Sequence, residues 1–266
     1  DRWLTDVHGP LLRRTPRPLA VDLGFGAEPV TAVEMAQRLR VQNPALELVG
    51  LEIDPARVAR ARERAGDLPG VTWAVGGFEL PVPRPPTVVR AFNVLRQYRE
   101  EDVPAIWSLL CAGLADDGVL VEGTCSEDGR RAAWVDLRRD GPASLTVALR
   151  LGSFARPSDV AARLPKVLIH RHVPGEPVHR LLAEADAALF DKTGTLTTGH
   201  PALTNAADLA PEDLALAAAL AHGAEVNWAD AEDEGKTPLV QAVLGVSEPR
   251  GLRAGHRCTV AFASSV

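Results

Sequence analysis

Short apolar runs alternate with amphipathic stretches through the first half of the chain. The apolar runs have the length of buried strands, and they predict strands at 19–22, 46–51, 71–75, 87–96 (a strand with its exit loop) and 118–123. Between them, apolar residues recur at the spacing of one helix face, which predicts helices at 29–41, 55–65 and 102–115, after a leading helix that ends before Pro16. Such alternation of strands and helices is typical of an α/β fold with a parallel sheet.

The pattern changes after the fifth strand. Residues 132–138 and 145–151 predict two strands joined by Arg139-Asp140-Gly141-Pro142, a hairpin signal rather than a helical crossover. A short helix at 157–164 and a last strand at 167–172 complete this part. We therefore expect a Rossmann-like α/β fold with a mostly parallel sheet of about seven strands, flanking helices and a poorly packed C-terminal extension.

A glycine turn between the first strand and the next helix is the candidate site. The segment Asp22-Leu23-Gly24-Phe25-Gly26-Ala27-Glu28-Pro29 passes from strand to helix through two glycines, and glycine lets the backbone turn sharply and approach a ligand closely. A dinucleotide fingerprint would need a third glycine where Pro29 stands. Asp22 and Glu28 flank the turn and would repel a pyrophosphate at the helix N-terminus, so the charge pattern favours a cationic ligand.

This turn resembles motif I of the class I SAM-dependent methyltransferases, acidic–x–Gly–x–Gly–x–Gly, with Glu28 in place of the third glycine. The resemblance covers residues 1–180 and implies S-adenosylmethionine as the cofactor, which carries a sulfonium and an ammonium group and no phosphate. The cofactor-binding residues that it implies are Asp22, Gly24, Phe25, Gly26, Glu52, Ile53, Phe78 and Asn93.

Three of these positions follow separate strands. Glu52 lies 26 positions beyond Gly26, near the spacing at which an acidic residue contacts a ribose. In the family, an acid at this place accepts hydrogen bonds from the ribose hydroxyls. The alternative is that Glu52 is an acid at a helix N-terminus, favoured by the helix dipole. Gly77 stands where family members often carry an acid that contacts adenine, which leaves backbone groups and the Phe78 ring, unless Phe78 belongs to the core. Asn93 falls in a loop that resembles motif IV, which faces the transferred methyl group.

The function that the resemblance implies is SAM-dependent methyl transfer to a small-molecule acceptor. Alignment of donor and acceptor can supply most of the acceleration, so no catalytic residue needs to be visible in the sequence and none is predicted. One alternative is a non-catalytic methyltransferase-like binding or structural protein. Another is an NAD-dependent oxidoreductase, which Pro29 and the acidic turn disfavour.

Composition narrows the setting. With 46% hydrophobic and 24% charged residues the chain is globular, and no apolar run reaches the ~18 residues of a membrane span. Three widely spaced cysteines form neither a disulfide framework nor a metal pattern, and the chain starts without a signal-peptide pattern, so we expect a cytoplasmic protein. The net charge of −6 makes a nucleic-acid partner unlikely on charge grounds. His170 and His172 lack a third ligand at a recognisable spacing, so we predict no metal site.

A change in charge marks a boundary near residue 180. Between Leu181 and Pro249 there is no arginine, and two lysines accompany 12 acidic residues. Within this part, Phe190-Asp191-Lys192-Thr193-Gly194-Thr195-Leu196-Thr197-Thr198-Gly199 resembles the phosphorylation motif of metal-transporting P-type ATPases, in which the matching aspartate, here Asp191, takes a phosphoryl group from ATP. That chemistry also needs a later Gly-Asp-Gly-x-x-x-Asp segment, and none follows, so phosphoryl transfer by Asp191 is not expected.

Residues 222–246 resemble one ankyrin repeat of the ArfGAP kind, with a Gly-Ala-x-Val-Asn turn and a Gly-x-Thr-Pro-Leu helix start. A single repeat cannot bury its apolar faces, so no protein partner is expected here. The predicted divisions are a methyltransferase-like domain at 1–184, an ATPase-like fragment at 185–221, an ankyrin-like repeat at 222–246 and an unassigned tail at 247–266. Three unrelated likenesses indicate a composite: an artificial or mis-joined sequence, or a methyltransferase-like core with a decorating tail.

Overall fold

The structure, a computed structural model, describes residues 1–150 and 154–189 and the strands at 239–245 and 257–263. The chain forms two compact units. The first contains Asp1–Gly123 and Asp136–Pro142, and the second contains Thr124–Val135 and the described residues from Ala143 onward. The candidate site lies in the first unit.

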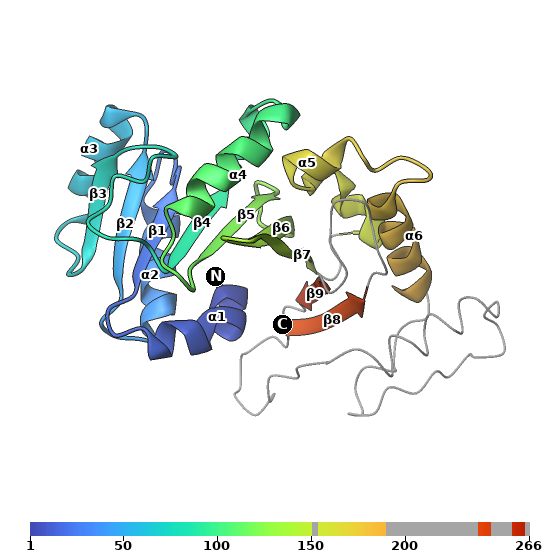
Figure 1. The fold of residues 1–266 in the computed structure, drawn as a ribbon, viewed down its shortest axis with the longest axis horizontal. Helices are drawn as coiled ribbons and strands as arrows, with labels where there is room; N and C mark the ends of the chain where they lie inside the picture. Colours follow the sequence, from blue (N-terminus) through green and yellow to red (C-terminus); the bar gives the residue numbers. More distant parts are fainter. Residues whose placement is uncertain (151–153, 190–238, 246–256, 264–266) are drawn as a thin grey trace. The chain divides into compact units, whose positions relative to one another are not determined.

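Five parallel strands form the sheet of the first unit (Figure 1). Their order across the sheet is β3 (Val71–Val75), β2 (Glu47–Glu52), β1 (Leu19–Leu23), β4 (Val88–Phe92) and β5 (Val119–Cys125). The chain moves outward from β1 to β3 and then returns to the other side of β1, so the strand order reverses between β1 and β4. In open parallel sheets, ligands bind beside the carboxyl ends of the strands at such a switch point.

Helices pack on the two faces of the sheet of this unit. They are α1 (Arg2–Arg14), α2 (Val30–Arg40), α3 (Pro55–Ala65) and α4 (Val103–Ala112), with the 3₁₀ turns η1 (Leu95–Gln97) and η2 (Glu100–Asp102) before α4. Right-handed crossovers on either side of the switch point place α2 and α3 on one face and α4 on the other. On α2, four buried residues at helical spacing face the sheet: Ala32, Met35, Ala36 and Leu39.

Local signals explain where these elements begin. Asp54 caps α3 by accepting a hydrogen bond from the Ala56 N–H at 2.8 Å, and Pro55 takes the first helical position, where no N–H is needed. The helix predicted at 55–65 and the strand predicted at 71–75 are confirmed at both ends. The other predicted elements of this unit are present with shifts of a few residues at their ends.

A hairpin and a small helical layer follow the parallel strands along the chain, and residues 136–142 of the hairpin belong to the first unit. β6 (Arg131–Arg138) and β7 (Gly141–Arg150) confirm the predicted hairpin, and the Arg150 N–H donates to the Arg130 carbonyl at 2.8 Å at its open end. A core of apolar side chains from the hairpin, from η3 (Pro157–Arg163) with the residue after it, and from α6 (Pro177–Leu189) holds the second unit together: Ala133, Val147, Leu149, Val160, Leu164, Val178 and Leu182. The short helix α5 (Lys166–Ile169) packs against this core.

The strand predicted at 167–172 is wrong. Residues 166–169 form the short helix α5 instead, because the Pro165 carbonyl accepts the N–H groups of Leu168 and Ile169 at 2.8 and 3.1 Å. Leu168 and Ile169 then pack against the small core of this unit. His170 and His172 consequently do not share a strand face.

The C-terminal strands are β8 (Leu239–Gly245) and β9 (Arg257–Ala263). They pair antiparallel, and β9 pairs in parallel with β7. The ankyrin resemblance implies a helix that continues from Leu239, but residues 239–245 bond to β9 as a strand instead. The motif around Asp191 and the rest of the ankyrin-like stretch lie outside the described residues, and α6 runs past the boundary predicted at 184.

The fold class is therefore the predicted one: a Rossmann-like, mostly parallel sheet with flanking helices. Within the described residues, no helix has both the length and the apolar character needed to cross a bilayer. The same part of the chain holds no cluster of three or more residues suited to bind a metal ion.

Candidate functional site

The turn after β1 requires both of its glycines. Gly24 has a φ of +71° and Gly26 a φ of +84°, a left-handed conformation that side chains disfavour. The Gly24 N–H donates to the Leu51 carbonyl at 2.7 Å, which ties the turn to the end of β2. A Cβ at Gly24 would lie 2.6 Å from Cγ2 of Val94, in the segment after β4, whereas a Cβ at Gly26 would meet nothing within 4 Å. The turn thus approaches the β4 exit closely at one glycine and is open at the other.

Glu52 places a carboxylate beside the open glycine. It is the last residue of β2 and is 5% exposed. Its Oε2 accepts the Gly26 N–H at 3.1 Å, and its Oε1 accepts the N–H groups of Ile53 and Asp54 at 2.9 and 3.3 Å. Arg57 Nη1 approaches Oε2 at 3.5 Å. The Gly26 N–H, which could otherwise bind an anion, therefore already donates to the Glu52 carboxylate.

Asp22 is part of a buried ion pair instead of facing the turn. Arg90, its register partner on β4, donates from Nε to Oδ1 at 2.9 Å and from Nη2 to Oδ2 at 2.7 Å. The two side chains are 5% and 11% exposed, and Arg90 also binds the carboxylate of Asp1. The guanidinium neutralises Asp22 in a bidentate pair.

Glu28, the other acidic residue that flanks the turn, is also in an ion pair. Its carboxylate forms a half-exposed ion pair with Arg64 of α3. Asp22 and Glu28 are held by close arginine partners, whereas Arg57 reaches Glu52 only at 3.5 Å, so the charge preference of the turn rests on Glu52.

Two apolar side chains, Ile53 and Phe78, follow β2 and β3 at the same edge of the sheet as Glu52. Ile53 is 69% exposed, and the loop after β3 approaches it, since a Cβ at Gly77 would lie 3.5 Å from Ile53 Cγ2. The next residue, Phe78, is half-buried, with its ring centroid 5.2 Å from that of Tyr98. Glu79, which was not among the predicted site residues, turns back and accepts the Gly77 N–H at 3.0 Å. An acid therefore does accompany this loop, two positions after Gly77.

Phe25 and Asn93 complete the set of predicted residues. The Phe25 ring is buried and meets the Trp73 ring edge-on at 5.0 Å, so it anchors the turn to the sheet. Asn93 is exposed and has a φ of +61°, and its N–H donates to the Gly123 carbonyl at 2.8 Å. The structure thus brings Gly24, Gly26, Glu52, Ile53 and the exit of β4 to one edge of the sheet, and it directs Asp22 and Phe25 into the protein.

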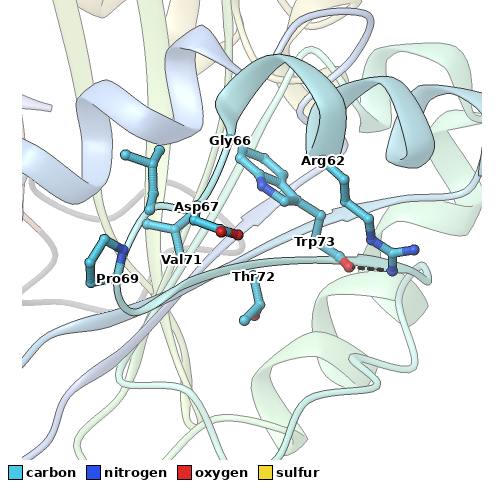
Figure 2. Close-up of a pocket in the computed structure, with 8 residues that line it drawn as sticks. Arg62, Gly66, Asp67, Pro69, Val71, Thr72 and Trp73 are labelled. Atoms are coloured by element: carbon cyan, nitrogen blue, oxygen red, sulfur yellow. Dashed lines mark hydrogen bonds between the residues drawn. The ribbon is translucent and has the colours of Figure 1, made fainter.

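A surface hollow of about 580 Å³ lies elsewhere in the first unit. Figure 2 shows it at the turn from α3 to β3, with the Asp67 carboxylate directed toward its centre and Arg62 bonded to the Trp73 carbonyl, at 2.7 Å. It opens at the amino end of β3, opposite the carboxyl edge that carries the glycine turn. Its polar side chains, Arg62, Asp67 and Thr72, are all exposed to water. This hollow is not the predicted cofactor site.

A histidine, an aspartate and a cysteine of the first unit do not form a nucleophilic site. His8 Nε2 lies 3.3 Å from Asp136 Oδ2, and both residues are buried. Burial, with the charges of Asp136 and Asp140, raises the pKa of the Cys111 thiol to about 11. The thiol therefore stays protonated at neutral pH and is a poor nucleophile.

No family model matches the chain, and the curated relatives described next match it over short stretches. Human Arf-GAP with coiled-coil, ANK repeat and PH domain-containing protein 3 is 76% identical over 49 residues, which are 18% of this chain and 6% of that protein. Nitrogen fixation protein FixI of Rhizobium meliloti is 60% identical over 40 residues, 15% of this chain and 5% of that protein. The chain thus spans about a twentieth of these relatives' length. The predicted Arf-GAP likeness is confirmed as a short, partial match, and the ATPase likeness stays a prediction.

Several solved structures resemble part of the chain at low scores. Magnesium protoporphyrin IX methyltransferase from Synechocystis PCC 6803, with bound SAH, is 21% identical, with 47% of this chain and 52% of that chain covered and a TM-score of 0.35. The CMeT domain of the citrinin polyketide synthase is 20% identical, with 42% and 30% covered and a TM-score of 0.36. Human N-acetylserotonin methyltransferase in complex with SAM is 19% identical, with 48% and 37% covered and a TM-score of 0.34. At these scores the likeness carries no conclusion about activity.

Proposed function

We propose that the first unit binds S-adenosylmethionine at the carboxyl ends of β1, β2 and β4 and transfers its methyl group to a small-molecule acceptor. The observation that carries the proposal is the Glu52 carboxylate, held 3.1 Å from the Gly26 N–H beside an open glycine turn. A pyrophosphate seated on that N–H would meet this carboxylate, which disfavours a dinucleotide. A ribose, in contrast, has hydroxyl groups that can donate hydrogen bonds to a carboxylate.

The hydrogen bonds of Glu52 leave room for such a ligand. An ionised carboxylate offers about four acceptor positions, and two of the contacts are long: Asp54 N–H at 3.3 Å and Arg57 Nη1 at 3.5 Å. The two hydroxyls of a ribose can replace these weaker contacts and leave the shorter bonds in place. Glu52 would then keep the turn ordered and recognise the sugar.

The neighbouring residues suit the other parts of the cofactor. Ile53 and the ring of Phe78 offer apolar surface for adenine, and Gly26 offers an approach free of side chains. When bound, S-adenosylmethionine supplies an electrophilic methyl group on its sulfonium. The chain then has to orient the acceptor, and Asn93, exposed at the exit of β4, is the polar residue placed for that task. Orientation alone can account for most of the rate.

Calorimetric titration with S-adenosylmethionine tests the binding step. Glu52→Gln should weaken binding by about 10- to 100-fold, because charge-assisted hydrogen bonds to the ribose are lost. Glu63→Gln makes the same chemical change at an exposed position of α3 and should bind like the parent protein. Circular dichroism should verify that each variant is folded.

Folded parent protein that gives no heat at millimolar ligand would contradict the proposal, as would equal binding by the two variants. Tighter binding of NAD than of S-adenosylmethionine would favour the oxidoreductase alternative. Binding without methyl transfer to any candidate acceptor would favour the non-catalytic alternative.

A further inference from the structure

An acidic residue lies inside the central sheet, and the described part of the chain supplies no ion-pair partner for it. Glu122 is the fourth residue of β5 and is 0% exposed. Both of its carboxyl oxygens are buried, and neither has a hydrogen-bond partner among the described residues. Buried carboxylates are normally paired with a cation or held by several donors, so the chemical state of this group needs its own explanation.

The strand beside Glu122 and the helix that faces it place no cation near its carboxyl among the described residues. Its register partner on β4 is Ala91. The neighbouring Arg90 points to the opposite face, since strand side chains alternate, and it is bound to Asp22. From α4, the indole Nε1–H of Trp107 is the polar group that acts on the carboxyl, but it lies outside hydrogen-bonding geometry.

The remaining titratable groups near this face are few. α4 carries one, the Cys111 thiol, which is protonated at neutral pH. On β6, the carboxylate of Asp136 lies beside His8 at 3.3 Å. No cation acts on Glu122 among the described residues: burial raises the pKa of its carboxyl to about 7, and the Trp107 N–H opposes part of that rise.

We propose that Glu122 is a buried proton-binding site, which holds a carboxylic acid in the folded protein up to neutral pH and loosens the packing of α4 on β5 when it ionises. The neutral acid is compatible with an apolar surrounding, whereas the anion is not. Gly123, the next residue, accepts the Asn93 N–H at the candidate site. Ionisation of Glu122 therefore affects the residue next to Gly123, whose carbonyl holds the loop that follows β4.

The sign of the pH effect follows from the two states. The pKa of an unfolded glutamate is 4.5, and that of Glu122 in the folded protein is about 7. Between these values the folded protein binds one more proton than the unfolded chain, so this group makes stability fall as pH rises. Its contribution is fully present below pH 4.5 and is lost as pH rises through about 7.

Urea unfolding from pH 5 to pH 8.5 tests the proposal with Glu122→Gln, which copies the shape of the neutral acid. Relative to the variant, the folding equilibrium constant of the parent protein should fall on the order of 10²-fold across this range. Glu63→Gln, at an exposed position of α3, should follow the parent curve. A difference between parent and Glu122→Gln that stays constant with pH would overturn the proposal.

Infrared spectroscopy of the parent protein provides a second readout that needs no variant to fold. With ¹³C-labelled glutamate, the carbonyl stretch of one protonated glutamic acid should be present at pH 6 and should disappear as the pH rises through about 7. Its absence at pH 6 would overturn the proposal. Neither experiment uses S-adenosylmethionine, so failure here would leave the proposed function untouched.

Discussion

Arg90→Ala should destabilise the protein by about 3–5 kcal/mol, the cost typical of leaving a buried charge without its partner. The guanidinium makes two hydrogen bonds to Asp22, at 2.9 and 2.7 Å, between two central strands of the sheet. Its removal leaves the carboxylate of Asp22 buried and uncompensated. Urea unfolding at neutral pH measures the loss.

The matched control is an exposed pair of the same unit. Arg14 and Asp117 lie 3.0 Å apart with side chains 57% and 70% exposed, so Arg14→Ala should cost under about 1 kcal/mol. The double variant Asp22→Leu/Arg90→Met removes both charges of this pair and should recover part of the stability lost in Arg90→Ala, while Asp1 keeps its contact with Arg38. A loss for Arg90→Ala no larger than that for Arg14→Ala would show that the pair does not hold β1 to β4.

Gly24→Ala should cost about 3 kcal/mol or more, whereas Gly26→Ala should cost about 1–2 kcal/mol. Both glycines have a positive φ, so both variants carry the strain of the left-handed conformation. Only at position 24 does the new methyl group also collide with Val94, at 2.6 Å. The free energies of unfolding of the two variants, measured with heat or urea, separate the cost of backbone strain from the cost of the steric clash with Val94.

A further variant checks the cause of that difference. Gly24→Ala/Val94→Ala removes the colliding methyl groups and should unfold at nearly the same urea concentration as Gly26→Ala, after correction for Val94→Ala alone. Equal stability of Gly24→Ala and Gly26→Ala would mean that the turn and the β4 exit do not meet closely. The switch-point geometry would then need revision.

Much of the fold could be predicted from the sequence because its signals are local. A strand buried on both faces is a short apolar run, and the proline at position 55 and the cap at Asp54 mark a helix start without reference to the rest of the chain. The strand expected at 167–172 failed because its apolar residues are equally suited to a helical turn packed on a small core. The Pro165 carbonyl accepts the N–H groups of Leu168 and Ile169, and these hydrogen bonds close the helical turn.

The site was harder to predict because it depends on register. That Asp22 pairs with Arg90 follows from β1 lying beside β4, 68 positions along the chain, which no local pattern reveals. One signal was available: an arginine within the apolar run Val88-Val89-Arg90-Ala91-Phe92 needs a buried acid. Glu122 sits in a similar run, and the same reasoning singles it out.

Glu52 shows the opposite case, in which chain spacing was enough. An acid at the end of the second strand must lie beside the glycine turn when the two strands are parallel neighbours, and the Gly26 N–H bond at 3.1 Å is the result.

A crystal structure of the chain grown with S-adenosylhomocysteine tests the central claim most directly. The account predicts adenosyl density at the carboxyl ends of β1 and β2, with the ribose hydroxyls on the Glu52 carboxylate and adenine against Ile53. Density seated in the hollow lined by Arg62, Asp67 and Trp73, or a ribose that avoids Glu52, would contradict it.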